Sequence, residues 1–179
     1  MAKGKGGIIG GIITLVIGGT VYSVSQEAIV ENFSKDTGMS QKASEQYVEN
    51  ITEDEMVPFD ELGSDFISSG QEILSVASKI DCINYEYEWE TYSLSCKEGK
   101  SQLKKLGNSE IALGKAYKIL DLESASTEDI SSVIRLIDRN NANYNLEIAS
   151  QLLDYSIIDE VKKTNSYNKA LLQAALDSD

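Results

Sequence analysis

The sequence predicts an all-α protein in which an apolar N-terminal helix precedes an acidic helical bundle. Residues 6–24 form an apolar run behind two lysines, and the remainder shows apolar residues at regular spacings of three and four. With 41% hydrophobic residues in 179, the chain can also bury a substantial core. We expect a membrane anchor, signal or pilin-type helix over 1–25, a stalk helix and hinge over 26–38, and an extracytoplasmic helical domain over 39–179.

The apolar run predicts a segment directed to a membrane. About nineteen residues would span about 28 Å as a helix, close to a hydrocarbon core of about 30 Å. Lys3 and Lys5 precede the run, whereas no acidic residue occurs before Glu27. By the positive-inside rule, the N-terminus would be cytoplasmic and the acidic bulk of the chain extracytoplasmic, at a membrane or the cell surface.

The sequence leaves three functions open for this run: a retained anchor, a cleaved signal and a pilin-type helix. A buried core helix in a cytosolic protein is a fourth interpretation. The run could be a retained signal anchor or a cleaved secretory signal, with Ser23 and Ser25 as small residues before Gln26. In an anchor, small residues would let another helix approach closely. The predicted helix-packing residues are Gly6, Gly7, Gly10, Gly11, Gly18 and Gly19.

The third function rests on a resemblance. A Lys-Gly pair directly before an unbroken apolar stretch, which then continues as an amphipathic helix, resembles the N-terminus of archaeal type IV pilins and related filament proteins. The resemblance covers about the first thirty residues. It implies that a dedicated peptidase cuts after Lys3-Gly4 or Lys5-Gly6, and that the apolar helix packs into a filament core.

Helical patterns dominate the remainder. Residues 26–35 and 40–50 predict short helices, and 59–80 and 97–122 predict two long helices that pack against each other. Ser126 or Thr127 can cap the next helix. Residues 138–145 are rich in turn formers and are expected to break or bend the helical run before the stretches 146–158 and 161–176.

Residues 82–96 fit both strand and helix spacing. On neither a single helix nor a single strand could Cys82 and Cys96 approach to bonding distance, so a disulfide would require a small β-hairpin or a loop. An extracytoplasmic location favours the bond over two buried, reduced thiols. Four aromatic residues of this segment either cover the core or contact a partner: Tyr85, Tyr87, Trp89 and Tyr92.

The composition disfavours several kinds of site. The chain has no histidine and only two cysteines, so neither a Ser-His-Asp arrangement nor a four-thiolate metal site can form. No catalytic residue, metal site or cofactor is predicted. A net charge of −13, with 16 basic against 29 acidic residues, disfavours nucleic-acid binding. Asn32 and Asn50 begin sequons and would accept glycans in a suitable host.

These patterns favour a non-enzymatic structural or assembly protein. It would assemble through the apolar N-terminal helix into a filament or membrane complex, with membrane lipid, copies of itself or other protein subunits as partners. The alternative is a membrane-anchored binding module that uses the aromatic loop 83–92. A hydrolase would require two carboxylates that converge in a deep pocket.

Overall fold

A computed structural model describes residues 11–51, 58–82 and 95–178. Within these residues a β-hairpin precedes seven helices, so the predominantly helical class is confirmed, with a small two-stranded antiparallel sheet added. The elements are β1 (Ile12–Ile17), β2 (Thr20–Ser25), α1 (Gln26–Thr37), α2 (Gln41–Ile51), α3 (Phe59–Lys79), α4 (Cys96–Leu120), α5 (Thr127–Asn143), α6 (Glu147–Leu152) and α7 (Tyr155–Asp177).

The prediction of an apolar N-terminal helix is wrong over residues 12–25, which form the hairpin. In the described part of the chain, no helix combines the length and the apolar character that crossing a membrane requires. Gly18 and Gly19 have φ of 59° and 74°, as the two central residues of a type I′ hairpin turn do. The β-branched residues on either side favour extended backbone, and two adjacent glycines disfavour a continuous helix.

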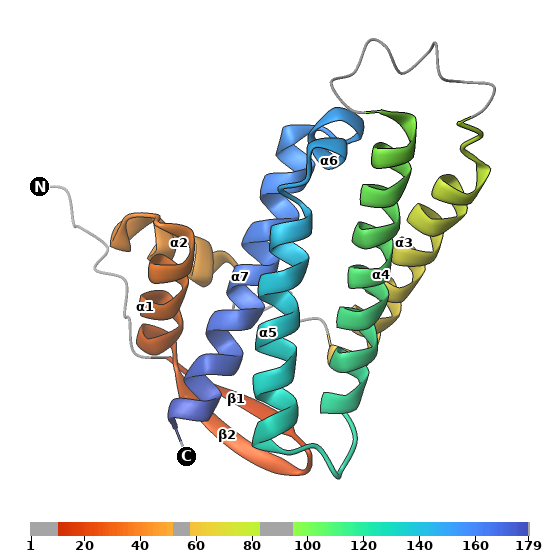
Figure 1. Cartoon of the computed structure of the whole chain (residues 1–179). Helices are drawn as coiled ribbons and strands as arrows, with labels where there is room; N and C mark the ends of the chain where they lie inside the picture. Colours follow the sequence, from red (N-terminus) through yellow and green to blue (C-terminus); the bar gives the residue numbers. More distant parts are fainter. Residues whose placement is uncertain (1–10, 52–57, 83–94, 179) are drawn as a thin grey trace, which may run out of the picture.

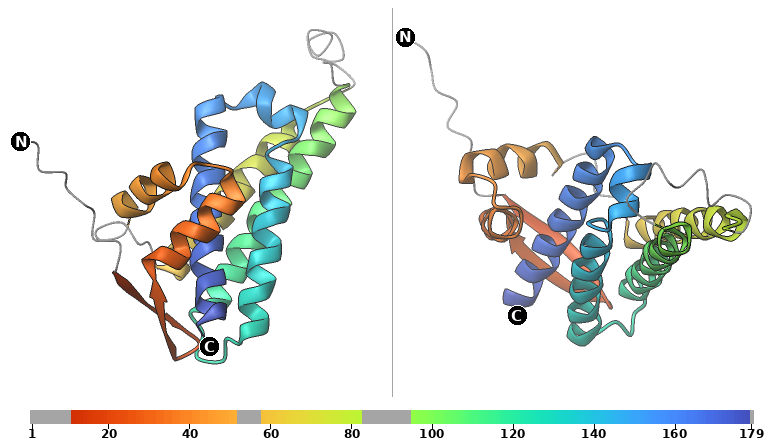
Figure 2. Two further views of the ribbon diagram at one scale, coloured as in Figure 1. Left: turned by 90° about the vertical axis from the view of Figure 1, so that its left-hand side faces the viewer. Right: turned by 45° about the horizontal axis from the view of Figure 1, so that its top comes forward.

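The helices form a bundle with the hairpin across one end (Figure 1). Helix α4 packs on α5, and α5 packs on α7, while α1 packs on the other side of α7. Helix α3 packs chiefly on α4, so these two make an arm at the side of the bundle (Figure 2). The hairpin lies where α7 ends and α5 begins, and Ser25 caps α1 by accepting a hydrogen bond from Ala28 N at 3.2 Å.

The main core lies between the hairpin and the bundle. It contains the buried side of the hairpin together with residues of α1, α4, α5 and α7, among them Phe33, Tyr117, Ile137 and Leu172, all at most 1% exposed. Each such side chain stabilises the fold by about 1.5–3 kcal/mol through its removal from water. The hairpin is therefore part of the same core as the helices.

The α3–α4 arm is confirmed, and it depends on glycines that the sequence analysis did not single out. Gly63 faces Gly114 and Gly70 faces Gly107, so each helix contributes two glycines seven residues apart. A Cβ added at Gly70 would lie 2.5 Å from the carbonyl oxygen of Gly107. The two backbones can approach this closely only because side chains are absent at both crossing points.

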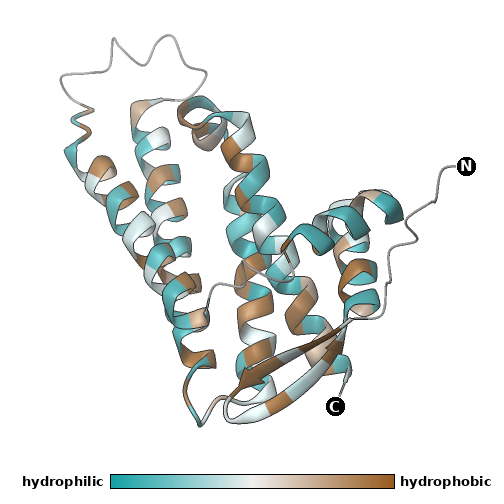
Figure 3. Cartoon of the chain, turned by 180° about the vertical axis from the view of Figure 1, so that it is seen from behind, coloured by the Kyte–Doolittle hydropathy of each residue, from teal (hydrophilic) through white to brown (hydrophobic). Residues whose placement is uncertain are grey.

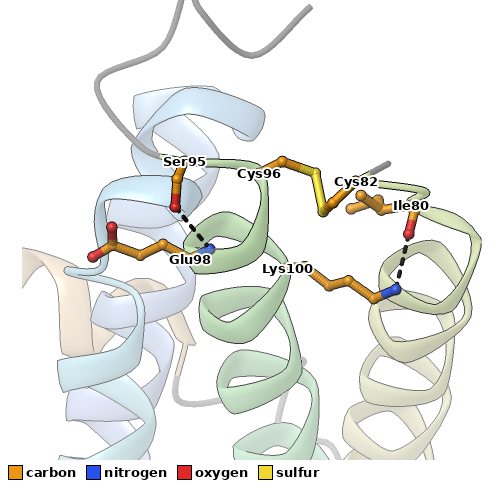
Figure 4. The surroundings of a disulfide bond; sticks show 6 residues. All are labelled: Ile80, Cys82, Ser95, Cys96, Glu98 and Lys100. Atoms are coloured by element: carbon orange, nitrogen blue, oxygen red, sulfur yellow. Dashed lines mark hydrogen bonds between the residues drawn. A yellow bond between two sulfur atoms is a disulfide. The ribbon is translucent and has the colours of Figure 1, made fainter. Parts of the chain in front are cut away.

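The predicted Cys82–Cys96 disulfide is confirmed, with a Cα–Cα distance of 5.5 Å, and it joins the two helices at the far end of the arm (Figure 4). Lys100 Nζ donates to the carbonyl oxygen of Ile80 at 2.8 Å, which satisfies an acceptor at the end of α3. Ser95 caps α4 by accepting from Glu98 N at 3.3 Å. The expected hairpin or loop falls mostly on 83–94, outside the described residues.

The expected break at 138–145 is wrong in position, because α5 continues to Asn143. Asn140 is buried, and its amide donates to Ser109 Oγ at 3.1 Å and to Glu110 Oε1 at 3.2 Å. Asn165 of α7 donates to Asn140 Oδ1 at 2.9 Å. These contacts supply the hydrogen bonds that an asparagine would otherwise find in a turn, so the helix is not interrupted.

The glycine contacts between α3 and α4 predict that alanine at Gly70 destabilises the fold, whereas alanine in place of glycine normally stabilises a helix. Gly70→Ala would normally stabilise a helix by about 1 kcal/mol. Here the added methyl group meets the Gly107 backbone, so we expect a net loss of about 1–3 kcal/mol in the free energy of unfolding, measured by urea denaturation. Ser68→Ala, at an exposed position of the same helix, should change it by less than about 0.5 kcal/mol. Stabilisation by Gly70→Ala would contradict the close approach of the two backbones.

Candidate functional site

The hairpin turn is anchored on the connection between α4 and α5. Gly18 N donates to the carbonyl oxygen of Leu120 at 3.3 Å. A Cβ at Gly18 would lie 2.0 Å from the carbonyl oxygen of Ala125, whereas a Cβ at Gly19 would meet nothing within 4 Å. The turn therefore needs glycine at position 18 both for its backbone conformation and for space.

The two faces of the hairpin differ in exposure. The strands pair antiparallel with Ile12 opposite Ser25 and Ile17 opposite Thr20, so alternate residues lie on opposite faces. The inner face packs into the core through Leu15, Ile17, Tyr22 and Val24, all at most 5% exposed, and through the partly buried Ile13. The outer face consists of Ile12, Thr14, Val16, Val21, Ser23 and Ser25.

This outer face is uncharged, and three of its six residues are apolar. Ile12, Val16 and Val21 are 70%, 56% and 62% exposed, and Val16 and Val21 lie directly opposite each other. Figure 3 shows the hydrophobic colour along much of β1 as it crosses the end of the bundle. A set of neighbouring exposed β-branched residues without a charged side chain is unusual for a solvated surface and typical of an interaction site.

The edge of β1 that faces away from β2 also lacks partners. Gln26 N donates to the carbonyl oxygen of Gly11 at 2.9 Å, so Gly11 is a hydrogen-bonded residue of the β1–β2 ladder. In an antiparallel pair only every second residue bonds to the partner strand, so the residues of β1 that bond to β2 are Ile13, Leu15 and Ile17. The N–H and C=O groups of Ile12, Thr14 and Val16 consequently point away from β2. They make no hydrogen bond within the described residues, and we call this side of the strand the free edge of β1.

A cavity of about 380 Å³ lies beside this edge. Three successive residues of β1 form one wall, and no lining residue comes from β2, which places the cavity on the side of β1 away from its partner strand. The other walls come from the end of α2, the start of α3 and one side of α7. The lining residues, here called the β1 groove, are Thr14, Leu15, Val16, Ile51, Pro58, Phe59, Leu62, Asp121, Thr164, Tyr167, Asn168 and Leu171.

Seven of the twelve residues that line the β1 groove are apolar, and Asp121 is the one charged residue among them. Tyr167 is 3% exposed, and its hydroxyl makes no hydrogen bond in the described part of the chain. Burial, with a smaller contribution from nearby Tyr47, raises the pKa of Tyr167 to about 12. The groove is therefore suited to apolar side chains and to backbone groups rather than to a charged small molecule.

The carboxylates elsewhere stabilise the fold. Glu110 is 2% exposed and accepts hydrogen bonds from Tyr144 and Asn140 at 2.8 and 3.2 Å, with no second carboxylate in this network. Asp36 and Asp138 both pair with Lys169 Nζ, which joins α1, α5 and α7. Burial alone would lower the pKa of Lys169, but the bonds to Asp138 and Asp36 raise it above its usual value. Among the described residues, no group of three potential ligands could hold a metal ion.

Several of the predicted site residues lie outside the described ranges. They are Gly6, Gly7, Gly10, Tyr85, Tyr87, Trp89 and Tyr92. Gly11, Gly18 and Gly19 are described, but they do not lie on a helix: Gly11 precedes β1, and the other two form the hairpin turn. Their predicted role in helix packing is wrong, because the segment is extended.

The two sequons lie on different helices. Asn32 is half-buried on α1, and Ser34 of the same sequon donates its hydroxyl to the carbonyl oxygen of Met39 at 2.9 Å. Asn50 is exposed near the end of α2, and the hydroxyl residue of its sequon, at position 52, lies outside the described ranges. Of the two asparagines, Asn50 is thus the more accessible to a glycosylating enzyme.

The sequence analysis missed the hairpin, its outer face and its free edge. The signal was present: two runs of six residues rich in β-branched side chains, separated by Gly18-Gly19. The same composition suits an apolar helix of membrane-spanning length, and hydropathy alone does not separate the two structures. The glycine pair was interpreted as a contact surface for another helix instead of a turn.

The hairpin turn predicts unequal effects of two alanine substitutions. Gly19→Ala introduces only the strain of positive φ, and we expect a loss of about 1–2 kcal/mol in the free energy of unfolding. Gly18→Ala adds a clash with the Ala125 backbone, so its loss should exceed that of Gly19→Ala by at least about 1 kcal/mol. Urea denaturation of both variants measures the difference. Equal effects, or stabilisation by both, would support a helix in place of the hairpin.

Burial of Tyr167 predicts sensitivity to alkaline pH. Its pKa in the folded state lies above the value of about 10 expected for an unfolded chain, so this residue favours folding below pH 10. The contribution is lost as the pH rises through about 12. Tyr167→Phe should keep stability at neutral pH and unfold less readily in alkali than the unmodified chain, followed by circular dichroism. Tyr155→Phe, at a side chain that is 80% exposed, is the control. Identical alkaline unfolding of all three proteins would contradict the prediction.

Comparison of the chain with protein-family models, with curated protein sequences and with solved structures found no match. The geometry of the described residues is therefore the basis for a functional proposal. Its distinctive surfaces are the uncharged outer face of the hairpin, the free edge of β1 and the adjoining β1 groove.

Proposed function

We propose that this chain is a non-enzymatic assembly protein whose copies associate through the N-terminal hairpin. The observation that carries the proposal is the outer face, where Ile12, Val16 and Val21 are each more than half exposed on a surface without charge. Their removal from water would favour association. The hairpin takes the place of the apolar helix as the element through which copies assemble.

Charge supports a second copy as the occupant of this surface. The chain carries a net charge of −13, and after Gln26 it has 14 basic and 29 acidic residues. Two such chains repel each other over most of their surfaces. Residues 6–26 contain no charged residue, so the hairpin lets two copies approach with little like-charge repulsion.

The proposal includes a location outside the cytoplasm, at a membrane or cell surface. The Cys82–Cys96 bond supports an oxidising compartment, because disulfides persist there and are rare in the cytosol.

A structural role is also supported by the chemistry of the described side chains. The chain has no histidine, and the buried Glu110 is held by hydrogen bonds from Tyr144 and Asn140. Asp36 and Asp138 share the charge of Lys169. These three carboxylates make contacts between helices. The two that lie close together, Asp36 and Asp138, are neutralised by Lys169.

The double variant Val16→Lys/Val21→Lys tests the proposal. It places two positive charges next to each other on the outer face without altering the ladder or the core, so we expect the associated species to dissociate to monomers in sedimentation velocity experiments. Val76→Lys, at a side chain on α3 that is 53% exposed, is the matched control and should sediment like the unmodified chain. An unmodified chain that stays monomeric at all concentrations, or association unchanged in the double variant, would refute the proposal.

A second candidate is a binding module at the tip of the α3–α4 arm. The disulfide joins Cys82 and Cys96, which flank the aromatic segment 83–92 in the sequence, at the far end of α3 from the β1 groove. If the protein binds its partner through this segment, the double variant Tyr87→Ala/Trp89→Ala should lose the complex with that partner, whereas Val16→Lys/Val21→Lys should keep it. The opposite pattern favours the hairpin.

A further inference from the structure

Within the described part of the chain, the free edge of β1 lacks the features by which proteins normally protect an edge strand. Natural edges carry charged side chains, proline or a bulge, or are covered by another element. β1 has the sequence IITLVI, pairs with β2 in unbroken register, and contains no charge or proline. The N–H and C=O groups of Ile12, Thr14 and Val16 have no partner among the described residues, so they can accept an additional strand.

The side chains of an added strand would contact the β1 groove, which lies beside the free edge of β1. Phe59 and Leu62 of α3 and Leu171 of α7 lie across the groove from β1. In an added strand, alternate side chains would point into the groove and toward the outer face. The strand would thus contribute one apolar residue to each side of the sheet.

The N-terminal residues of the chain have the composition that this site requires. Residues 6–10 read GGIIG, five residues to match the five from Ile12 to Val16, with two isoleucines that would lie on opposite faces of a strand. Lys3 and Lys5 precede them, and residues 1–10 contain no acidic group. They are complementary in charge to Asp121 in the groove and to an acidic body of net charge −15.

Geometry at Gly11 favours a different copy as the source of this strand. Gly11 continues the ladder with β2 by accepting from Gln26 N, and it lacks the positive φ of Gly18 and Gly19. The chain therefore does not make at Gly11 the type I′ turn that would return it along its own β1. Residues 1–10 of a neighbouring copy are free of this constraint.

We propose that residues 6–10 of one copy add as a third strand to the free edge of β1 in the next copy. This inference rests on the proposed assembly function and specifies its contact. The donor strand and the acceptor edge are different surfaces, so the interface is head-to-tail. Repetition of such a contact gives a ring if it closes and an open filament if it does not.

Two proline variants test the edge. Thr14→Pro removes an N–H that points to the free edge of β1, and Ser23→Pro removes the corresponding N–H on the opposite edge, since Thr14 and Ser23 are cross-strand partners. Neither N–H belongs to the β1–β2 ladder, so both hairpins should form to a similar extent. We expect the apparent dissociation constant to rise at least about tenfold in Thr14→Pro and to change little in Ser23→Pro. Equal effects would overturn the inference.

Complementation tests the donor strand. A chain that lacks residues 2–10 keeps the acceptor edge but has no donor, whereas Thr14→Pro keeps the donor but blocks the edge. Each should be monomeric alone, and an equimolar mixture should form a dimer that grows no further, observed by sedimentation velocity. Association of the truncated chain by itself, or no dimer in the mixture, would overturn strand addition.

The outcomes separate this inference from the proposed function. If Val16→Lys/Val21→Lys dissociates the assembly while Thr14→Pro and the truncation leave it intact, face-to-face packing explains assembly and strand addition is wrong. If the unmodified chain is monomeric, both are wrong. Pairing of the strand with its own β1 would also overturn the inference. It would be detected as a monomer in which a cysteine pair, Gly7→Cys/Thr14→Cys, at the positions that a two-residue turn at Gly11 would place opposite each other, forms an internal disulfide.

Discussion

Packing of one face of the hairpin onto the ends of the helices is the interaction on which the rest of the structure depends. Leu15, Ile17, Tyr22 and Val24 join residues of α1, α4, α5 and α7 in a single core, and the Gly18 turn bonds to the end of α4. A strand buries only alternate residues, so half of this apolar segment remains on the surface. The exposed Val16 and Val21 are a direct consequence of burying their neighbours.

The helical part positions this hairpin and leaves its outer side accessible. Lys169 and the Asn140 network join α1, α4, α5 and α7 through ion pairs and hydrogen bonds. The α3–α4 arm is attached at the same end, where Phe59 and Leu62 form a wall of the β1 groove. The disulfide lies at the other end of the arm. The hairpin and the disulfide end of the arm, which are the two candidate contact regions, are therefore separated by the length of α3, about 30 Å for 21 residues.

Much of the helical architecture could be predicted because its signals are local. Gly38 ends α1 with a φ of 69°, and Ser126 begins α5 in a capping box with Asp129. The apolar spacing of α3 and α4 predicted their pairing, and the two cysteines predicted the link between them. By contrast, the close approach at Gly70 and Gly107, and the continuation of α5 through Asn140, depend on partners distant in the sequence.

By itself, the sequence determined the helical class, the approximate positions of the long helices and the absence of histidine chemistry, and it favoured the disulfide. These follow from periodicity, capping residues and composition, which act within a few residues or over the chain as a whole. Only the tertiary structure decided that residues 12–25 are a hairpin and that one strand edge has no partner in the part of the chain that the structure describes. An apolar run can form backbone hydrogen bonds either as a helix or as paired strands, and the choice between them depends on the surface against which the run packs.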